Sequence, residues 1–212
     1  RYNIEYAIGD TMLVSYPKSG RTWLRMILAK LLDIKGVSTD KMEMLPATHK
    51  SAYDLNHKYG KNIRVLFLYR NIGDVSMSYF REYENEDTGL APFRAPKTNE
   101  ILKDQNKSDA VRTIMPDIVS YNWIWFLNPY GHNILYVSYE RLQEDAFAAV
   151  SDILKYLGIY EYYTDEEIKI AVDYSKFDNM VRIEEGEGKN LLRAYKGNFG
   201  VHRPEGRADR PP

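Results

Sequence analysis

One segment constrains the fold of this chain more than any other: an apolar run that passes through a proline- and glycine-containing turn into a helical pattern. It reads LVSYPKSGRTWLRMIL and covers residues 13–28. Its start has the apolar character of a buried strand, and after the turn apolar residues recur at helical spacing, at Leu24, Ile27, Leu28 and Leu31. A strand, a tight loop and a helix in this order form the layout of a phosphate-binding loop. In that layout the helix start offers free N–H groups and the positive end of its dipole to an anion.

The loop differs from the phosphate-binding loop of ATPases, whose pattern is G-x-x-x-x-G-K-[ST]. Ser15 stands at the first glycine position and Arg21 at the lysine position. Gly20 lets the backbone approach an anion closely. The side chains that we expect to assist in anion binding are Lys18, Ser19 and Thr22. An ordinary strand–helix turn with two surface cations is the alternative interpretation.

Apolar runs and helical patterns alternate along the rest of the chain. They predict strands at 11–16, 64–69 and 133–139, and helices at 22–32, 74–84, 116–127, 146–157 and 165–174. This alternation indicates an α/β class, with a central, mainly parallel sheet flanked by helices. A length of 212 residues fits a single domain over residues 1–212. Residues 85–110 are polar and contain two prolines, so we expect a surface excursion or a lid there.

Composition argues against several functional classes. The net charge of −1 disfavours a general nucleic-acid binder, which usually carries a basic excess. No apolar stretch is long enough to cross a membrane and the first residues lack a signal-peptide pattern, so we expect a cytoplasmic protein. Without cysteine the chain has no disulfide, thiolate metal site or cysteine nucleophile. The four histidines are scattered, and we expect no metal site.

Three segments resemble the soluble, cytosolic-type sulfotransferase family, which uses 3′-phosphoadenosine 5′-phosphosulfate. YPKSGRTW at residues 16–23 is similar to the family's 5′-phosphosulfate loop. RNIGDVSMSYF at residues 70–80 resembles its 3′-phosphate segment, although Ile72 and Gly73 stand where Pro-Lys is common. YKGNFGVH at residues 195–202 is similar to the late element R-K-G-x-x-G-D-W. The resemblance implies a nucleotide-kinase-like fold with a phosphate-binding loop.

The resemblance also implies which residues contact the nucleotide. They are Lys18, Ser19, Gly20, Arg21, Thr22, Trp23, Arg70, Ser78, Tyr139, Phe177, Arg193, Lys196 and Gly197. Arg70 and Ser78 correspond to the 3′-phosphate ligands. Trp23 corresponds to a tryptophan that stacks on adenine, with Phe177 as the opposite wall; simple packing of Trp23 against the helix is the alternative.

The late element departs from the family pattern at its first position, where Tyr195 replaces arginine. Arg193 or Arg203 is available to supply the missing charge. The stretch from residue 193 to residue 210 is basic, and it is either a solvated tail or a cap on the nucleotide's phosphates.

Two residues are expected to take part in the chemistry. Sulfuryl transfer, like phosphoryl transfer, depends on positioning and on stabilisation of charge, and Lys18 is the expected cation at the leaving oxygen. A hydroxyl acceptor needs a base. The family's catalytic histidine lies in a K-T-H stretch, which corresponds to Thr48-His49 here, with Ala47 in place of the lysine. A structural histidine is the alternative for His49, and we expect His57 at the surface.

The resulting hypothesis is a sulfotransferase that acts on a hydroxyl or amine of a small-molecule acceptor, without a metal. A nucleotide or small-molecule kinase and an inactive nucleotide-binding protein are the alternatives. Acceptor loops vary independently of a cofactor site, so these motifs do not identify the acceptor. We expect Trp123, Trp125 and Phe126 in the core rather than at a ligand.

Overall fold

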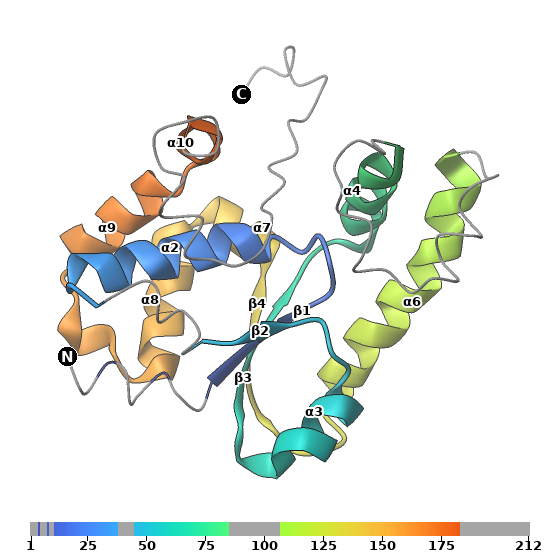
Figure 1. Cartoon of the computed structure of the whole chain (residues 1–212), viewed down its shortest axis with the longest axis horizontal. Helices are drawn as coiled ribbons and strands as arrows, with labels where there is room; N and C mark the ends of the chain where they lie inside the picture. Colours follow the sequence, from blue (N-terminus) through green and yellow to red (C-terminus); the bar gives the residue numbers. More distant parts are fainter. Residues whose placement is uncertain (1–3, 5–7, 9–10, 38–44, 85–106, 183–212) are drawn as a thin grey trace.

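A four-stranded parallel sheet with the strand order β2–β1–β3–β4 forms the centre of the molecule (Figure 1). The computed structural model describes residues 4, 8, 11–37, 45–84 and 107–182. Its strands are β1 (Thr11–Ser15), β2 (Ala47–Thr48), β3 (Arg64–Tyr69) and β4 (Asn133–Ser138). The predicted α/β class with a parallel sheet is therefore confirmed.

The two central strands are the best-buried and the most fully paired. β1 is buried along its whole length and pairs with β3 from Thr11↔Arg64 to Ser15↔Leu68. Continuous burial of this kind is expected for a parallel strand covered on both faces. β2 is a two-residue strand that pairs with β1 only through Leu13↔Ala47 and Val14↔Thr48.

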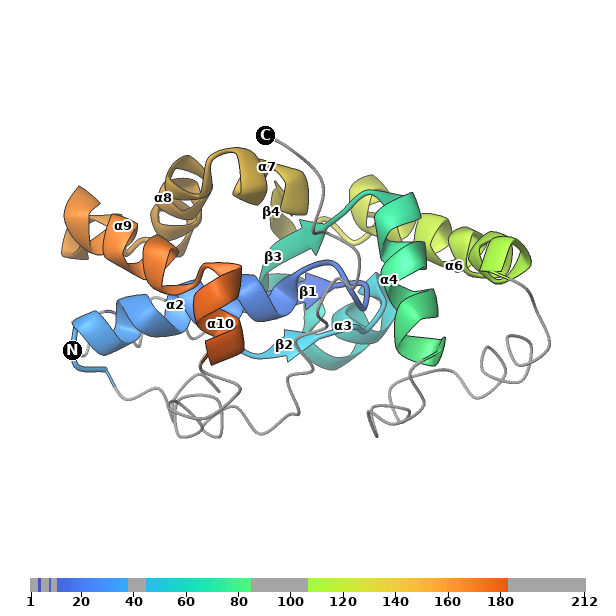
Figure 2. The ribbon, with the colours of Figure 1, turned by 90° about the horizontal axis from the view of Figure 1, so that it is seen from above.

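Helices cover both faces of the sheet and give the molecule three layers (Figures 1 and 2). One face carries α2 (Arg21–Ile34), α8 (Ala146–Leu157) and α9 (Asp165–Tyr174). The other carries α3 (Ala52–Tyr59) and α6 (Lys107–Leu127), and α4 (Ile72–Glu84) packs against α6. Because side chains alternate along a strand, Leu13 enters the first core and Met12 and Val14 enter the second.

Short elements complete the described part of the chain. They are the 3₁₀ turns η2 (Gly60–Asn62) and η5 (Tyr160–Tyr162) and the helices α7 (Tyr139–Glu144) and α10 (Phe177–Arg182). α10 packs on α2 through Met180 and Met26. Among the helices that the structure describes, none has both the length and the apolar character needed to span a bilayer.

Two sequence predictions about α6 are wrong. The helix begins at Lys107, so Pro116 lies inside it rather than in its first turn, and one backbone hydrogen bond of the helix is missing there. Of the three aromatic residues expected in the core, only Trp125 is buried; Trp123 is 60% and Phe126 43% exposed. Adjacent residues on a helix point in different directions, so a cluster of aromatic letters cannot all face the core.

Two further expectations have different outcomes. His57 is exposed, as predicted. Residues 85–106 of the predicted excursion lie outside the described residues, whereas residues 107–110 belong to α6.

Candidate functional site

The residue that follows each strand lies at the same edge of the sheet. These residues are Tyr16, His49, Arg70 and Tyr139. In open parallel sheets, ligands bind at this edge where neighbouring strands send their helices to opposite faces. Here β1 leads to α2 on one face and β3 leads to α4 and α6 on the other. The switch point therefore lies between the loop at residues 16–20 and Arg70.

The loop at residues 16–20 turns tightly before α2. Lys18 and Gly20 both adopt left-handed backbone conformations, with φ angles of 70° and 90°. The N–H of Ser19 donates to the carbonyl of Tyr16 at 3.3 Å, and Ser19 is only 1% exposed. No side chain caps the N-terminus of α2 in the described part of the chain. The turn thus directs an uncapped helix start towards the sheet edge, which is the geometry of an anion site.

Gly20 is required by space as well as by backbone angle. A Cβ atom at this position would lie 2.3 Å from Cδ2 and 2.6 Å from Cε2 of Tyr139. Tyr139 is the first residue after β4, so its ring packs directly on the loop. Glycine is the residue that tolerates both the positive φ and this close approach.

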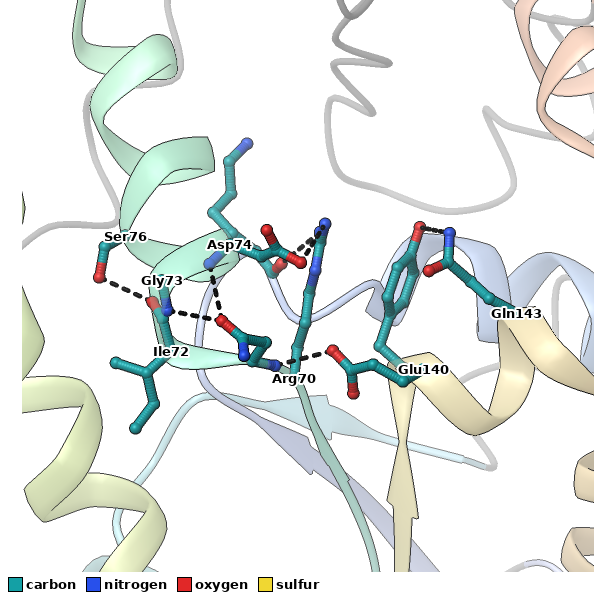
Figure 3. Close-up of polar contacts among 10 residues, drawn as sticks. Arg70, Ile72, Gly73, Asp74, Ser76, Glu140 and Gln143 are labelled. Carbon is teal, nitrogen blue, oxygen red and sulfur yellow. Dashed lines mark hydrogen bonds and ion pairs between the residues drawn. The ribbon is translucent and has the colours of Figure 1, made fainter. Parts of the chain in front are cut away.

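Arg70 is held between the loop and α4 (Figure 3). Its guanidinium lies 4.2 Å from the ring centroid of Tyr139, and Nη1 approaches the carbonyl of Lys18 at 3.5 Å. Nη2 lies 3.7 Å from a carboxylate oxygen of Asp74. Nε is buried and has no hydrogen-bond partner among the described residues. The guanidinium is therefore oriented, yet part of its donor capacity is unused.

The turn from β3 into α4 is fixed by its own hydrogen bonds (Figure 3). Asn71 Oδ1 accepts from the backbone N–H groups of Gly73 and Asp74, at 2.9 and 3.3 Å. The N–H of Asn71 donates to Glu140 of α7 at 2.8 Å. Ser78 is half-buried and lies one helical turn beyond Asp74, on the same face of α4 as the carboxylate that pairs with Arg70.

His49 is anchored through one ring nitrogen. Nδ1 lies 2.6 Å from the carbonyl oxygen of Ser15. Because a carbonyl only accepts, Nδ1 carries the proton in the neutral ring, and Nε2 keeps its lone pair. Burial, and next the charge of Arg21, lower the pKa of His49 to about 4, although the hydrogen bond to Ser15 opposes the shift. The imidazole is therefore neutral at ordinary pH, and its Nε2 is unprotonated.

Arg21 contributes a second guanidinium near this histidine. Burial, and next the neighbouring Arg25, lower the pKa of Arg21 to about 10. Its Nη1 is buried and meets no hydrogen-bond partner in the described ranges. Arg21 is the first residue of α2, so its charge adds to the positive end of the helix dipole.

Tyr121 is a part of the site that the sequence analysis missed. Its hydroxyl lies 3.1 Å from the carbonyl oxygen of Ser15 and 3.1 Å from that of Lys50. Burial raises the pKa of Tyr121 well above its usual value, so the phenol stays protonated and donates. No local pattern distinguishes this tyrosine from the other aromatic residues of α6, because its role depends on how α6 crosses the sheet.

The remaining predicted residues have different placements. The ring of Trp23 meets the ring of Tyr139 edge-on, with 5.6 Å between centroids, and it also packs against Met26 and Met180. Phe177 begins α10 and is 45% exposed. The structure gathers at one edge Lys18, Ser19, Gly20, Arg21, Trp23, His49, Arg70 and Tyr139. Thr22, in the first turn of α2, is half-buried, and Arg193, Lys196, Gly197 and Arg203 lie outside the described residues.

The model of the sulfotransferase domain family matches residues 37–185, more than two thirds of the chain. The segments at residues 16–23 and 195–202 lie outside the matched range.

Curated proteins with similar sequences share only about a quarter of their residues with this chain. The chain is 24% identical to the amine sulfotransferase of Oryctolagus cuniculus, over 86% of this chain and 66% of the relative. It is 26% identical to sulfotransferase 6B1 of Pan troglodytes, over 81% of this chain and 61% of the relative. The chain thus spans slightly less than two thirds of the length of these two relatives.

Solved structures show the same fold. A mouse sulfotransferase, SULT7A1, complexed with PAP, superposes with a TM-score of 0.63 at 20% identity, over 86% of this chain and 68% of that protein. Retinol dehydratase, in complex with androsterone and the inactive cofactor PAP, gives a TM-score of 0.53 at 14% identity, over 84% of this chain and 68% of that protein.

Proposed function

The chain belongs to the sulfotransferase domain family, and from this membership we propose that it is a sulfotransferase. In this proposal residues 1–212 form one domain that transfers a sulfuryl group from 3′-phosphoadenosine 5′-phosphosulfate to a hydroxyl or amine of a small-molecule acceptor. The observation that supports it best is the meeting of the loop at residues 16–20, Arg70 and His49 at one sheet edge.

The residues at this edge suit a nucleotide that carries anionic groups at two positions. The uncapped start of α2, with Lys18 and Arg21, suits the 5′-phosphosulfate. Arg70, with its unused Nε, and Ser78 suit the 3′-phosphate, because guanidinium binds phosphate through parallel hydrogen bonds. Two proteins of similar fold were solved with PAP, which is 3′,5′-adenosine bisphosphate, the cofactor without its sulfuryl group. Their structures support a nucleotide of this kind here.

The proposed chemistry uses His49 and Lys18. Nε2 of His49 accepts the proton that the acceptor hydroxyl or amine loses, and the Ser15 carbonyl then stabilises the imidazolium through Nδ1–H. Lys18 stabilises the negative charge that develops on the leaving phosphate oxygen. The cofactor supplies the sulfuryl group that is transferred.

The 3′-phosphate gives the sharpest test, because a kinase has no use for it. We expect calorimetry to show that the protein binds 3′,5′-adenosine bisphosphate more tightly than 5′-adenosine monophosphate by roughly 1.5–3 kcal/mol for each charged hydrogen bond gained. The Arg70→Ala variant should lose most of this difference and keep its affinity for the monophosphate.

A matched control lies on the same strand. Arg64, at the opposite end of β3, donates to the carbonyl of Tyr156, so Arg64→Ala removes an arginine far from the candidate site. This variant should retain the preference for the bisphosphate. Equal wild-type affinity for the two nucleotides, or a preference for ATP with Mg²⁺, would contradict the proposal and favour the kinase alternative.

A further inference from the structure

Tyr121 occupies a place in the site that none of the sequence motifs assigns. We propose that Tyr121 is a positioning residue that fixes the imidazole of His49 for proton transfer. The inference rests on the proposed role of His49 as the base.

His49 follows a strand that offers little support. β2 has only two residues, and its last register pair with β1 is Val14↔Thr48. Immediately beyond that pair, the carbonyl oxygen of Ser15 faces side chains: Nδ1 of His49 at 2.6 Å and the hydroxyl of Tyr121 at 3.1 Å. At Ser15, hydrogen bonds from side chains therefore take the place of the backbone hydrogen bonds between β1 and β2, and they hold the imidazole of His49.

The hydroxyl of Tyr121 is itself well placed to act as a fixed point. Tyr121 lies on α6 between the fully buried Ile118 and Trp125, and its side chain packs against the core cluster that contains Trp125. Its ring meets the ring of Tyr16 edge-on at 5.4 Å and lies 6.2 Å from the ring of Phe67. These ring contacts and the packing against the core limit the positions that the phenol can take.

From that position the phenol bridges two backbone carbonyls. Its single hydrogen is shared between Ser15 and Lys50, whose carbonyl oxygens both lie 3.1 Å away. Ser15 is the hydrogen-bond partner of the His49 ring, and Lys50 is the residue that follows His49 in the chain. Tyr121 therefore ties together the two backbone segments whose relative position determines where the imidazole points.

This arrangement matters for proton transfer because neutral histidine has two tautomers. Donation from Nδ1 to Ser15 keeps the proton on Nδ1 and leaves Nε2 as the base. If the Ser15 carbonyl or the His49 backbone shifts, the ring can turn or exchange tautomers, and Nε2 no longer points at the acceptor. Tyr121 acts only through these carbonyls, and so its role is one of positioning.

The Tyr121→Phe variant tests the role because it removes the hydroxyl and keeps the packed ring. In nitrogen-15 NMR spectra, with the His49 signal identified by its loss in His49→Ala, the wild type should show one tautomer protonated on Nδ1. Tyr121→Phe should show averaged ring-nitrogen shifts. It should also lose about 10–100-fold in kcat, the scale expected when a reacting group is misplaced, with an unchanged KM for the sulfuryl donor.

Tyr136→Phe is the matched control. The Tyr136 hydroxyl donates to the Trp125 carbonyl at 2.9 Å, a bond of the same kind away from His49, and its loss should change neither measurement. A Tyr121→Phe protein that keeps the wild-type ring-nitrogen shifts overturns the positioning role. If the wild type transfers no sulfuryl group but Tyr121→Phe still alters the His49 tautomer, the proposed function fails and the structural link between Tyr121 and His49 stands.

Discussion

At the scale of single residues, two arginines of the candidate site have buried nitrogen atoms with unused hydrogen-bonding capacity. Nη1 of Arg21 and Nε of Arg70 are both buried, and neither meets a partner among the described residues. Native proteins rarely leave such groups unsatisfied, because each costs about 1–3 kcal/mol. We expect the anionic nucleotide of the proposed function to satisfy these two guanidinium groups, which lie near one edge of the sheet.

His49 gives the first residue-scale prediction. If His49 is the base, His49→Ala should reduce turnover about 10²–10⁴-fold at saturating acceptor and leave nucleotide affinity nearly unchanged. His57→Ala is the control, because His57 is exposed on α3 and, among the described residues, stacks only on Tyr53. Comparable turnover in the two variants would refute the assignment.

The pH dependence of turnover gives a second test of the same residue. A base works in its neutral form, and burial together with Arg21 lowers the pKa of His49 to about 4 from the usual 6.5. The rate should therefore stay constant as the pH falls through 6.5 and decline only near pH 4. Arg21→Gln removes a positive charge, so its acid limb should move to higher pH. A wild-type decline centred at 6.5 would show that His49 is not held as described.

At the scale of elements, capping residues mark the ends of the two helices whose bounds were predicted correctly. α8 and α9 have the predicted ends because Asp145 and Thr164 cap their starts and Gly158 ends α8. α3 was missed although its signal is present: Ser51 and Asp54 form a capping box. β2, with two residues, is too short to show any period.

The residues of the candidate site also fall into two groups: those that the sequence predicted and those that only the structure shows. The loop at residues 16–20 and Arg70 belong to contiguous motifs, so local sequence was sufficient to propose them. Tyr121 and Glu140 reach the site from α6 and α7, and their contacts with Ser15 and Asn71 depend on how distant elements pack. Patterns within a single sequence do not predict how distant elements pack, so these two residues were not proposed.

An ion pair between two helices gives the element-scale prediction. Lys35, just after α2, donates to both carboxylate oxygens of Glu167 in α9, at 2.6 and 2.7 Å, and each side chain is about one quarter exposed. The hydrogen bond from Lys35 is the main reason that the pKa of Glu167 is lowered. A lowered carboxylate pKa stabilises the fold above the unfolded pKa of about 4.3, and this contribution disappears as the pH falls through the folded value.

Lys35→Met should therefore lower the free energy of unfolding by about 0.5–1 kcal/mol at pH 7, because the pair is partly exposed. Urea unfolding at pH 7, 5, 4 and 3 should show that the difference from wild type narrows below about pH 4.3. A small remainder is expected from the lost contact with the ring of Tyr163, which lies 5.2 Å from Nζ. Lys176→Met removes a local, exposed pair with Asp173 and should have almost no effect. An equal loss in both variants at every pH would contradict this account.

At the scale of the whole molecule, the candidate site exists only when the sheet is assembled. Its residues follow four strands, from Tyr16 after β1 to Tyr139 after β4, and the sheet order differs from the chain order. The unfolded chain cannot bring these residues together. A ligand that binds the folded state alone must therefore raise the stability of the whole domain.

This coupling gives the last prediction. At a concentration 100 times its dissociation constant, 3′,5′-adenosine bisphosphate should stabilise the protein by about 2.7 kcal/mol and raise Tm by roughly 5–10 °C for a chain of this size. Thermal unfolding with 5′-adenosine monophosphate at the same concentration should give a much smaller shift in Tm, because this nucleotide has no 3′-phosphate for Arg70 to bind. Arg70→Ala should reduce the shift with the bisphosphate to that with the monophosphate, whereas Arg64→Ala should preserve it. If the bisphosphate leaves Tm unchanged while ATP with Mg²⁺ raises it, the candidate site binds ATP as a kinase does. The assignment of Arg70 to a 3′-phosphate is then wrong.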